Sequence, residues 1–152
     1  MLVNLNDVLK KAQKEHYAVG LFNTTDTDML DAAIGAAQEL NSPIIIGTAE
    51  VLLPYGELKL IAPSIIKAAE RATVPVVVHY DHGLTFERCM EALKLGFTSV
   101  MFDGSAGDSE KNIADTAVLC AQFGKELEQL GIRYGISYIS VEQAKKNLNK
   151  EI

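Results

Sequence analysis

The chain has 152 residues, of which 48% are hydrophobic and 22% charged, a composition typical of one soluble globular domain. Its net charge of −6 excludes a general nucleic-acid-binding protein, because such proteins concentrate Lys and Arg on one surface. Two cysteines are too few for a disulfide framework and no apolar run reaches the length of a membrane span, so we expect a cytoplasmic protein with neither nucleic-acid nor membrane partners.

Apolar, strand-like segments alternate with helical segments along the chain, after an opening helix predicted over residues 5–15. Pro63 predicts a kink or a late start in one of the later helices, and Gly96 predicts the end of another. Strands are predicted at 17–23, 42–48, 74–80, 97–103 and 134–140. Helices are predicted at 25–40, 58–72, 85–96, 110–130 and 141–152.

This alternation predicts a parallel sheet covered by helices, in a single α/β domain spanning residues 1–152. Two architectures remain open. Five βα units form either part of a (β/α)8 barrel of the TIM type or an open doubly wound sheet of the flavodoxin type. Length alone favours the open sheet, because a complete barrel takes ~250 residues.

Polar residues lie at the ends of four predicted strands that are otherwise nearly free of them. In parallel α/β folds, functional groups gather where strands end and loops begin, so these residues are the candidates for a site. They are Asn23, Thr48, His79, Asp81, His82 and Asp103.

The segment "PVVVHYDHGL" (75–84) places three of these residues together. Strand alternation would put His79 and Asp81 on one face and His82 on the other, unless Gly83 turns the chain and brings His82 to the same rim. A neutral imidazole is a good Zn²⁺ ligand, and a nearby carboxylate can carry a proton or orient the imidazole. The same residues also suit a simpler arrangement, a buried core histidine followed by two residues that cap the next helix.

The motifs "VVVHYDHG" and "GFTSVMFDGS" together resemble the class II, zinc-dependent ketose-bisphosphate aldolases, which include the fructose- and tagatose-bisphosphate aldolases. In that family the third strand ends in His-x-Asp-His and the fourth carries Gly-Phe-x-Ser-Val-Met-Ile-Asp. "LVNLNDVLKKAQKEHYAVGLFN" and "NSPIIIGTAE" resemble its first helix and first two strands. The resemblance covers about residues 1 to 120, the N-terminal half of the family's fold, and implies a partial TIM-type barrel.

The resemblance implies reversible aldol cleavage of a ketose bisphosphate to dihydroxyacetone phosphate and an aldehyde phosphate. Asp81 matches the catalytic acid/base, which exchanges a proton with the hydroxyl that becomes the aldehyde. His82 matches one of three histidine ligands of the catalytic Zn²⁺, the Lewis acid that polarises the ketose carbonyl and stabilises the enediolate.

Four other residues acquire implied roles from the same resemblance. Asp103 matches a carboxylate of a second or alternative metal site, and His79 matches a histidine that supports the site. Asn23 and Thr48 lie where the family places polar groups that contact the substrate.

A zinc site of this kind needs three protein ligands and an open position. The chain has three histidines in total, and His16 lies near the end of the opening helix. In the family, the other zinc ligands and the phosphate-binding loops come from later strands, which we expect to be absent here. "KELEQLG" (125–131) imitates the family's Glu-x-Glu-Leu-Gly motif but continues a helical pattern, so Glu126 and Glu128 are expected to be solvated helix residues.

Three interpretations follow. The chain is an aldolase-like enzyme whose missing ligands come from another subunit, a catalytically inactive truncated homologue that binds or oligomerises, or an unrelated open α/β binding domain. The expected ligand is a phosphorylated ketose or dihydroxyacetone phosphate. Because a half-barrel would expose its inner face and edge strands, we expect either a homo-oligomer or a rearranged sheet with helices on both faces.

Overall fold

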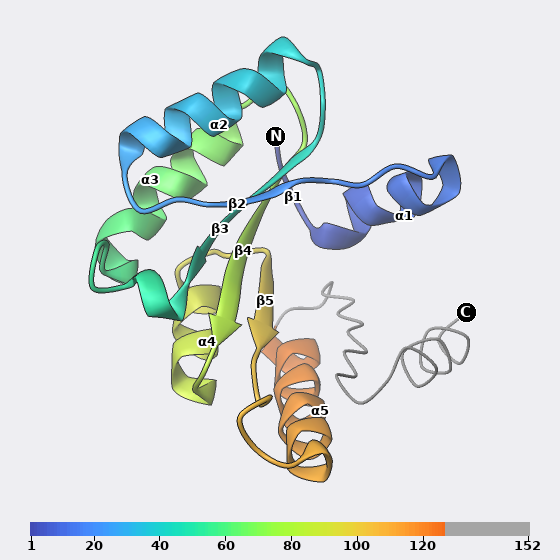
Figure 1. Ribbon diagram of the computed structural model, residues 1–152, viewed down its shortest axis with the longest axis vertical. Coiled ribbons are helices and arrows are strands. Elements are labelled where there is room, and N and C mark those ends of the chain that lie inside the picture. The colour runs from blue at the N-terminus through green and yellow to red at the C-terminus, as the bar shows by residue number, and fades with distance from the viewer. Residues whose placement is uncertain (127–152) are drawn as a thin grey trace. The chain divides into compact units, whose positions relative to one another are not determined.

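The computed structural model describes residues 1–126 (Figure 1), which belong to two compact units, Met1–Asp103 and Gly104–Ile152. The first unit contains a sheet of five strands, and the described part of the second contains α5 (Ser109–Glu126). The strands are β1 (Leu2–Val3), β2 (Leu21–Asn23), β3 (Ile44–Ala49), β4 (Val76–Gly83) and β5 (Ser99–Phe102). The helices of the first unit are α1 (Leu5–Glu15), α2 (Thr27–Glu39), the short 3₁₀ helix η1 (Glu50–Leu52), α3 (Leu58–Arg71) and α4 (Phe86–Lys94).

All strand pairs in the sheet are parallel, and strands β2, β3, β4 and β5 lie side by side in chain order (Figure 1). The two-residue strand β1 pairs with the start of β4, on the edge that β5 occupies further along. Chain-order neighbours are the pattern of a (β/α)8 barrel, whereas the strand order of a doubly wound sheet reverses part-way. The fold is therefore an α/β partial barrel, as the aldolase resemblance implies.

The register of β3 and β4 divides their residues between two faces. Ile45 and Val77 are partners, and Val8 of α1 packs on both of them at the N-terminal end of the sheet. Side chains alternate along a strand, so the residues two and four positions further on share this face and approach the opposite end of the sheet. They are Gly47, Ala49, His79 and Asp81.

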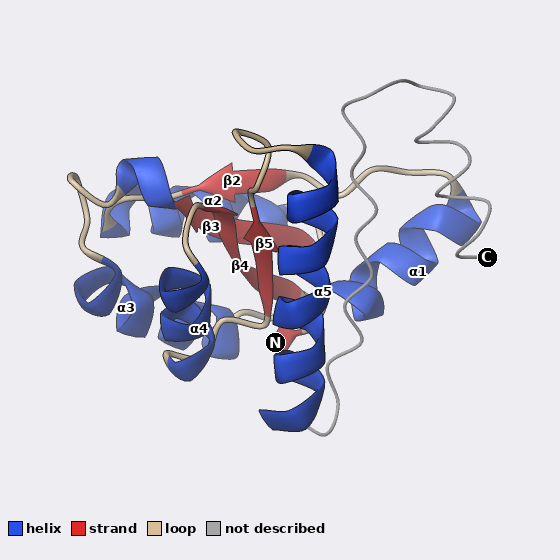
Figure 2. Cartoon of the chain, turned by 90° about the horizontal axis from the view of Figure 1, so that it is seen from below, coloured by secondary structure: helices blue, strands red, loops and turns tan. Residues whose placement is uncertain are grey.

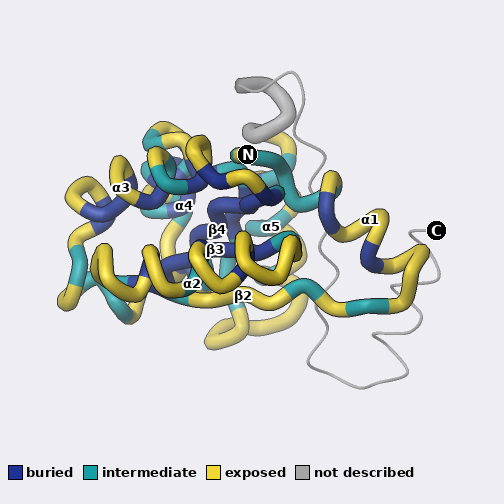
Figure 3. The backbone as a smooth tube through the Cα atoms, turned by 90° about the horizontal axis from the view of Figure 1, so that it is seen from above, coloured by how far each residue is buried: buried dark blue, intermediate teal, exposed yellow. Residues whose placement is uncertain are grey.

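The other face of the sheet is the buried side that lies against the helices. Helices α2, α3 and α4 pack on strands β3 to β5 (Figure 2), and the tube in Figure 3 is buried along β3 and β4. Ile46 and Val78 are partners on this face and are both 0% exposed, as is Ile65 of α3. Burial of these branched side chains is the main apolar contribution to the stability of the unit.

The predicted helix boundaries agree with the local capping signals. Asp26 accepts a hydrogen bond from the Met29 amide at the start of α2, and Thr85 accepts one from the Arg88 amide at the start of α4. Gly96 has φ of 102° and follows α4, a conformation that glycine adopts without strain. Helix α3 does not start late: it begins at Leu58 and continues through Pro63.

The strands differ from the prediction at their ends. Strand β2 is shorter than the predicted 17–23, β4 runs on to Gly83 through the three polar residues, and β1 was not predicted. The strand predicted at 134–140 and the helix at 141–152 lie outside the described residues, as does Glu128. None of the helices in the part of the chain that the structure describes has the length and apolar character needed to span a bilayer.

Replacing Ile46 by alanine should lower the free energy of unfolding by about 2–5 kcal/mol, because it leaves a cavity at a fully buried position of the central sheet. The matched control is Leu60→Ala on α3, whose side chain is 79% exposed and whose loss should cost at most about 0.5 kcal/mol. Urea denaturation measures both. Equal effects of the two substitutions would contradict the assigned core.

Candidate active site

Five of the six candidate residues come together at the carboxyl ends of the strands. Four of them lie on two strands and the fifth directly follows a third strand, so the sheet, rather than a flexible loop, sets most of their positions. They are Asn23 on β2, His79, Asp81 and His82 on β4, and Asp103 after β5.

Asp81 is the centre of this group. Nδ2 of Asn23 donates a hydrogen bond to its Oδ2 at 2.9 Å, and Nε2 of His79 lies 3.7 Å from its Oδ1. The His79 imidazole, then the Asn23 amide, lowers the pKa of Asp81 to about 2, against the opposing effect of partial burial. Asp81 is therefore a carboxylate at neutral pH, able to accept a proton.

Asn23 reaches Asp81 by crossing β3, which lies between β2 and β4. It passes over Gly47, its register partner: a Cβ atom on Gly47 would lie 2.5 Å from Oδ1 of Asn23 and 3.2 Å from the carbonyl oxygen of His79. The missing side chain at residue 47 is thus what lets the amide of Asn23 cross the strand. Within the described residues, Oδ1 of Asn23 is buried without a hydrogen-bond partner.

His79 is 4% exposed, and its two ring nitrogens face different groups. Nδ1 lies 2.8 Å from the hydroxyl oxygen of Ser99 on β5, and Nε2 faces Asp81. When the Ser99 hydroxyl donates to Nδ1, the imidazole carries its proton on Nε2, where it stabilises the Asp81 carboxylate. His79 is thus a buried histidine, as the simpler sequence interpretation expected, but its contact with Asp81 makes it part of the site.

His82 departs from strand alternation. Its φ is 46°, in the left-handed region that is rare for residues with a side chain, and the pairing of β4 with β5 shifts register between Tyr80 and Gly83. The result is that Nε2 of His82 lies 4.0 Å from Oδ1 of Asp81, on the same rim. The chain turns at His82 itself, and not at Gly83 as the sequence suggested.

Asp103 holds the His82 imidazole by its other nitrogen. Nδ1 of His82 and Oδ2 of Asp103 are 2.6 Å apart, and this hydrogen bond is the main reason why the pKa of His82 is raised. A histidine that donates from Nδ1 to a carboxylate keeps its Nε2 lone pair for another partner, which is the usual arrangement behind a metal-ligating histidine.

His82 is therefore suited to be one ligand of a metal site, through its Nε2. Across residues 1–126, no three His, Cys, Asp or Glu side chains are arranged to hold a metal ion together. A catalytic zinc centre takes three protein ligands. The described residues do not assemble a whole zinc site, and Asp103 acts in this structure as the hydrogen-bond partner of His82.

Thr48 is the candidate that the fold separates from the others. Its register partner is Tyr80, so it lies on the helix-covered face of the sheet, while its neighbour Ala49 is paired with Asp81. Thr48 is fully buried, and its hydroxyl oxygen has no hydrogen-bond partner among the described residues. Contact between Thr48 and a substrate remains a prediction from the resemblance alone.

Two residues of the site were not singled out from the sequence. Gly47 interrupts the apolar run "SPIIIGT", and a glycine inside a strand often marks a close approach of another group, a signal that was present. Ser99 lies in the quoted motif "GFTSVMFDGS" but carries no local signal for its contact with His79, which depends on the pairing of β4 with β5.

Comparisons of this chain with known proteins identify the family to which the sheet and its strand-end residues belong. The family model of class II fructose-bisphosphate aldolase matches residues 3–128. The chain belongs to the class II fructose-bisphosphate aldolase family. The fructose-bisphosphate aldolase of Thermus caldophilus is 41% identical over 116 residues, which cover 76% of this aldolase-family chain and 38% of that protein.

Relatives with another substrate in their name match this class II aldolase-family chain equally well. The 6-phospho-5-dehydro-2-deoxy-D-gluconate aldolase of Halalkalibacterium halodurans is 40% identical over 123 residues, covering 79% of this chain and 43% of that protein. Among solved structures, the YdjI aldolase of Escherichia coli K12 superposes with a TM-score of 0.88 at 30% identity, covering 99% of this chain and 58% of that one. The chain thus spans less than half the length of the two curated relatives.

The lowered pKa of Asp81 predicts a pH dependence of stability. The carboxyl has an ordinary pKa of 3.8 in the unfolded chain and about 2 in the folded one, so its contribution is complete above the unfolded value and disappears as the pH falls through the folded value. In Asp81→Asn this contribution, on the order of 2 kcal/mol, is missing at pH 6 and the deficit shrinks toward pH 2.

Urea denaturation at a series of pH values measures this difference between the wild type and Asp81→Asn. Asp31→Asn, which removes an exposed carboxylate of α2, is the control. A deficit in Asp81→Asn that is equal at pH 2 and pH 6 would show that folding does not lower the pKa of Asp81.

Gly47→Ala should destabilise the protein and release Asn23 from Asp81, because the new Cβ atom occupies the path of the amide. The free energy of unfolding should fall, and the pKa of Asp81, followed by NMR titration, should rise as one stabilising hydrogen bond is lost.

The matched control is Gly35→Ala in α2, where a Cβ atom meets nothing within 4 Å. That change should stabilise the protein by about 0.5–1 kcal/mol, because alanine favours a helix over glycine. The two substitutions should therefore differ in sign, and a stabilising Gly47→Ala would contradict the assigned path of Asn23.

Proposed function

We propose that this chain carries the acid/base group and one metal ligand of a zinc-dependent class II ketose-bisphosphate aldolase. The reaction is reversible aldol cleavage of fructose- or tagatose-bisphosphate to dihydroxyacetone phosphate and an aldehyde phosphate, in the cytoplasm. One observation carries this proposal above the others: Nε2 of His82, with its Nδ1 held by Asp103, lies 4.0 Å from the ionised carboxylate of Asp81.

Asp81 has the proton-transfer role. It accepts the proton of the hydroxyl beside the bond that breaks and returns a proton in the condensation direction. His79 and Asn23 hold its two oxygens, so that the carboxylate is oriented before the substrate binds. Asn23 also has an unpartnered buried oxygen, which suits a hydrogen bond from a substrate hydroxyl.

His82 has the metal-binding role, through Nε2. When bound, Zn²⁺ supplies Lewis-acid polarisation of the ketose carbonyl. Asp103 fixes the tautomer and the orientation of the His82 ring. Its assignment to a second or alternative metal site rests on the resemblance alone.

The remaining zinc ligands and the phosphate-binding groups are proposed to come from a second copy of the chain. Strands β2 and β5 each have an edge that no other described strand pairs with, and Phe22 of β2 is 53% exposed. An unpaired edge strand with exposed apolar side chains favours association. This supports the expectation of a homo-oligomer.

A second candidate function is a catalytically inactive aldolase homologue that binds a phosphorylated ketose or forms oligomers. The observation that favours it is the incomplete metal site of residues 1–126, where no three His, Cys, Asp or Glu side chains are arranged to hold a metal ion.

The test is a coupled assay of aldol cleavage with and without added Zn²⁺. Three substrates are compared: fructose bisphosphate, tagatose bisphosphate and 6-phospho-5-dehydro-2-deoxy-D-gluconate. Asp81→Ala should lower kcat by at least about 100-fold through loss of the acid/base group. His82→Ala should abolish zinc dependence, and its Zn²⁺ binding, measured by calorimetry, should weaken at least about tenfold.

Lys14→Ala on the exposed side of α1 is the control and should leave both measurements unchanged. Zinc binding that does not depend on His82 would contradict the proposed ligand. A wild type without cleavage of any of the three substrates would favour the inactive homologue.

A further inference from the structure

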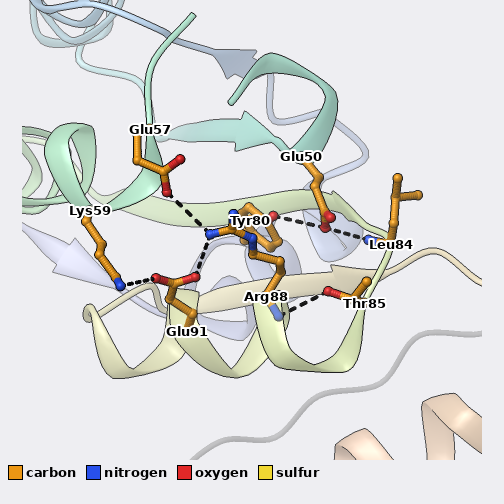
Figure 4. Close-up of polar contacts among 8 residues, drawn as sticks. All are labelled: Glu50, Glu57, Lys59, Tyr80, Leu84, Thr85, Arg88 and Glu91. Carbon is orange, nitrogen blue, oxygen red and sulfur yellow. Dashed lines mark hydrogen bonds and ion pairs between the residues drawn. The ribbon is translucent and has the colours of Figure 1, made fainter. Parts of the chain in front are cut away.

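A single carboxylate oxygen links the two ends of the segment that carries Asp81 and His82. Glu50, the first residue of η1, follows strand β3. Its Oε2 accepts hydrogen bonds from the hydroxyl of Tyr80, at 3.1 Å, and from the backbone amide of Leu84, at 2.8 Å (Figure 4).

We propose that Glu50 is a positioning residue that holds residues 81–83 in their bulged conformation, and so keeps Asp81 and His82 on one rim. Its effect on catalysis rests on the function proposed above, whereas its effect on the segment's conformation does not.

The conformation of this segment needs an external restraint. His82 has φ of 46°, and the pairing of β4 with β5 shifts register between Tyr80 and Gly83. A residue with a side chain is strained in the left-handed region and persists there only when its surroundings hold it. Regular alternation would instead turn His82 to the face opposite Asp81.

Tyr80 gives Glu50 a fixed point in the core. Its ring is 0% exposed and packs edge-on against Phe97, with ring centroids 6.2 Å apart. Burial, followed by the charge of Glu50, raises the pKa of Tyr80, so its hydroxyl remains a proton donor. The same carboxylate also accepts a hydrogen bond from the Leu84 amide, so residues 81–83 lie between two residues that are both bonded to Glu50.

Glu50 acts from the side of the sheet opposite Asp81. Tyr80 is on the helix-covered face of β4, whereas Asp81 and His79 share the opposite, inner face of the sheet. Glu50 is bonded to Tyr80 and to the backbone of Leu84, and its role is therefore to position residues 81–83 rather than to transfer a proton.

A neighbouring charged cluster provides the control. Arg88 pairs with Glu57 at 3.3 Å and with Glu91 at 2.7 Å, and Lys59 pairs with Glu91 at 3.2 Å (Figure 4). These ion pairs join α3 and its N-cap residue to α4. Glu57→Ala thus removes a nearby carboxylate without touching residues 80–84.

The experiment compares Glu50→Ala, Glu50→Gln, Tyr80→Phe and Glu57→Ala in the full chain. The first readout is NMR of the uncomplexed protein: hydrogen exchange of the Leu84 amide and the backbone conformation at His82. In Glu50→Ala the Leu84 amide should exchange at least about tenfold faster and His82 should leave the left-handed region. Glu50→Gln, whose carbonyl oxygen still accepts both hydrogen bonds, should restore most of the wild-type behaviour.

The second readout is the zinc-dependent cleavage assay. Glu50→Ala should lower kcat at least tenfold, because the acid/base group Asp81 and the proposed zinc ligand His82 are both displaced. Glu50→Gln should recover most of kcat, Tyr80→Phe should fall between the two, and Glu57→Ala should match the wild type.

The two readouts separate the proposals. A changed conformation in Glu50→Ala with an inactive wild type supports the positioning role and overturns the proposed function. An active wild type with Leu84 exchange and kcat equal in Glu50→Ala and Glu57→Ala overturns the positioning role. If Glu50→Ala does not fold, Tyr80→Phe decides: Leu84 exchange and kcat unchanged from the wild type overturn the role, and a partial loss of both supports it.

Discussion

Strand β4 is the element on which the rest of the structure depends. It pairs with β3 along one edge and with β1 and then β5 along the other, and its register decides which side chains face inward. A shift of one residue would move His79 and Asp81 to the helix-covered face and destroy both the core and the site. The apolar partners Val76, Val77 and Val78, all fully buried, make such a shift costly.

The site is an arrangement of opposite charges and hydrogen bonds at the end of this strand. Two carboxylates, Asp81 and Asp103, alternate with two imidazoles, His79 and His82. Each carboxylate has a nitrogen partner, and each imidazole has an oxygen near it, so burial of the charged groups is compensated. The same arrangement gives different roles to the histidines, because His79 is buried and His82 is half-exposed.

Much of the fold followed from the sequence, because apolar runs and capping residues are local signals. The opening helix was predicted at its observed bounds, and the aldolase resemblance led to the partial barrel that chain length alone did not favour. The orientation of the His82 side chain was harder to predict from the sequence. Regular alternation along a strand is the usual expectation, and the left-handed turn occurs at His82 itself, a residue with a side chain. Thr48 looked equivalent to the other strand-end residues in the sequence, but it is paired with Tyr80 and therefore lies on the face of the sheet opposite Asp81.

The contacts that complete the site could not be predicted locally. The hydrogen bond from Asn23 to Asp81 joins residues 58 positions apart, and that from Tyr80 to Glu50 joins residues 30 positions apart. Such contacts depend on which strands become neighbours, which is a property of the folded sheet. Gly47 is the exception, because a glycine within an apolar run indicates a close approach even when the approaching group is unknown.

The crossing of Asn23 over Gly47 has a consequence for how this sequence can vary. The two positions share one small volume on the inner face of the sheet, so a larger residue at 47 is compatible only with a shorter one at 23. A larger residue at 47 would therefore cost Asp81 the hydrogen bond that it receives from residue 23, and positions 23 and 47 should change as a pair during evolution.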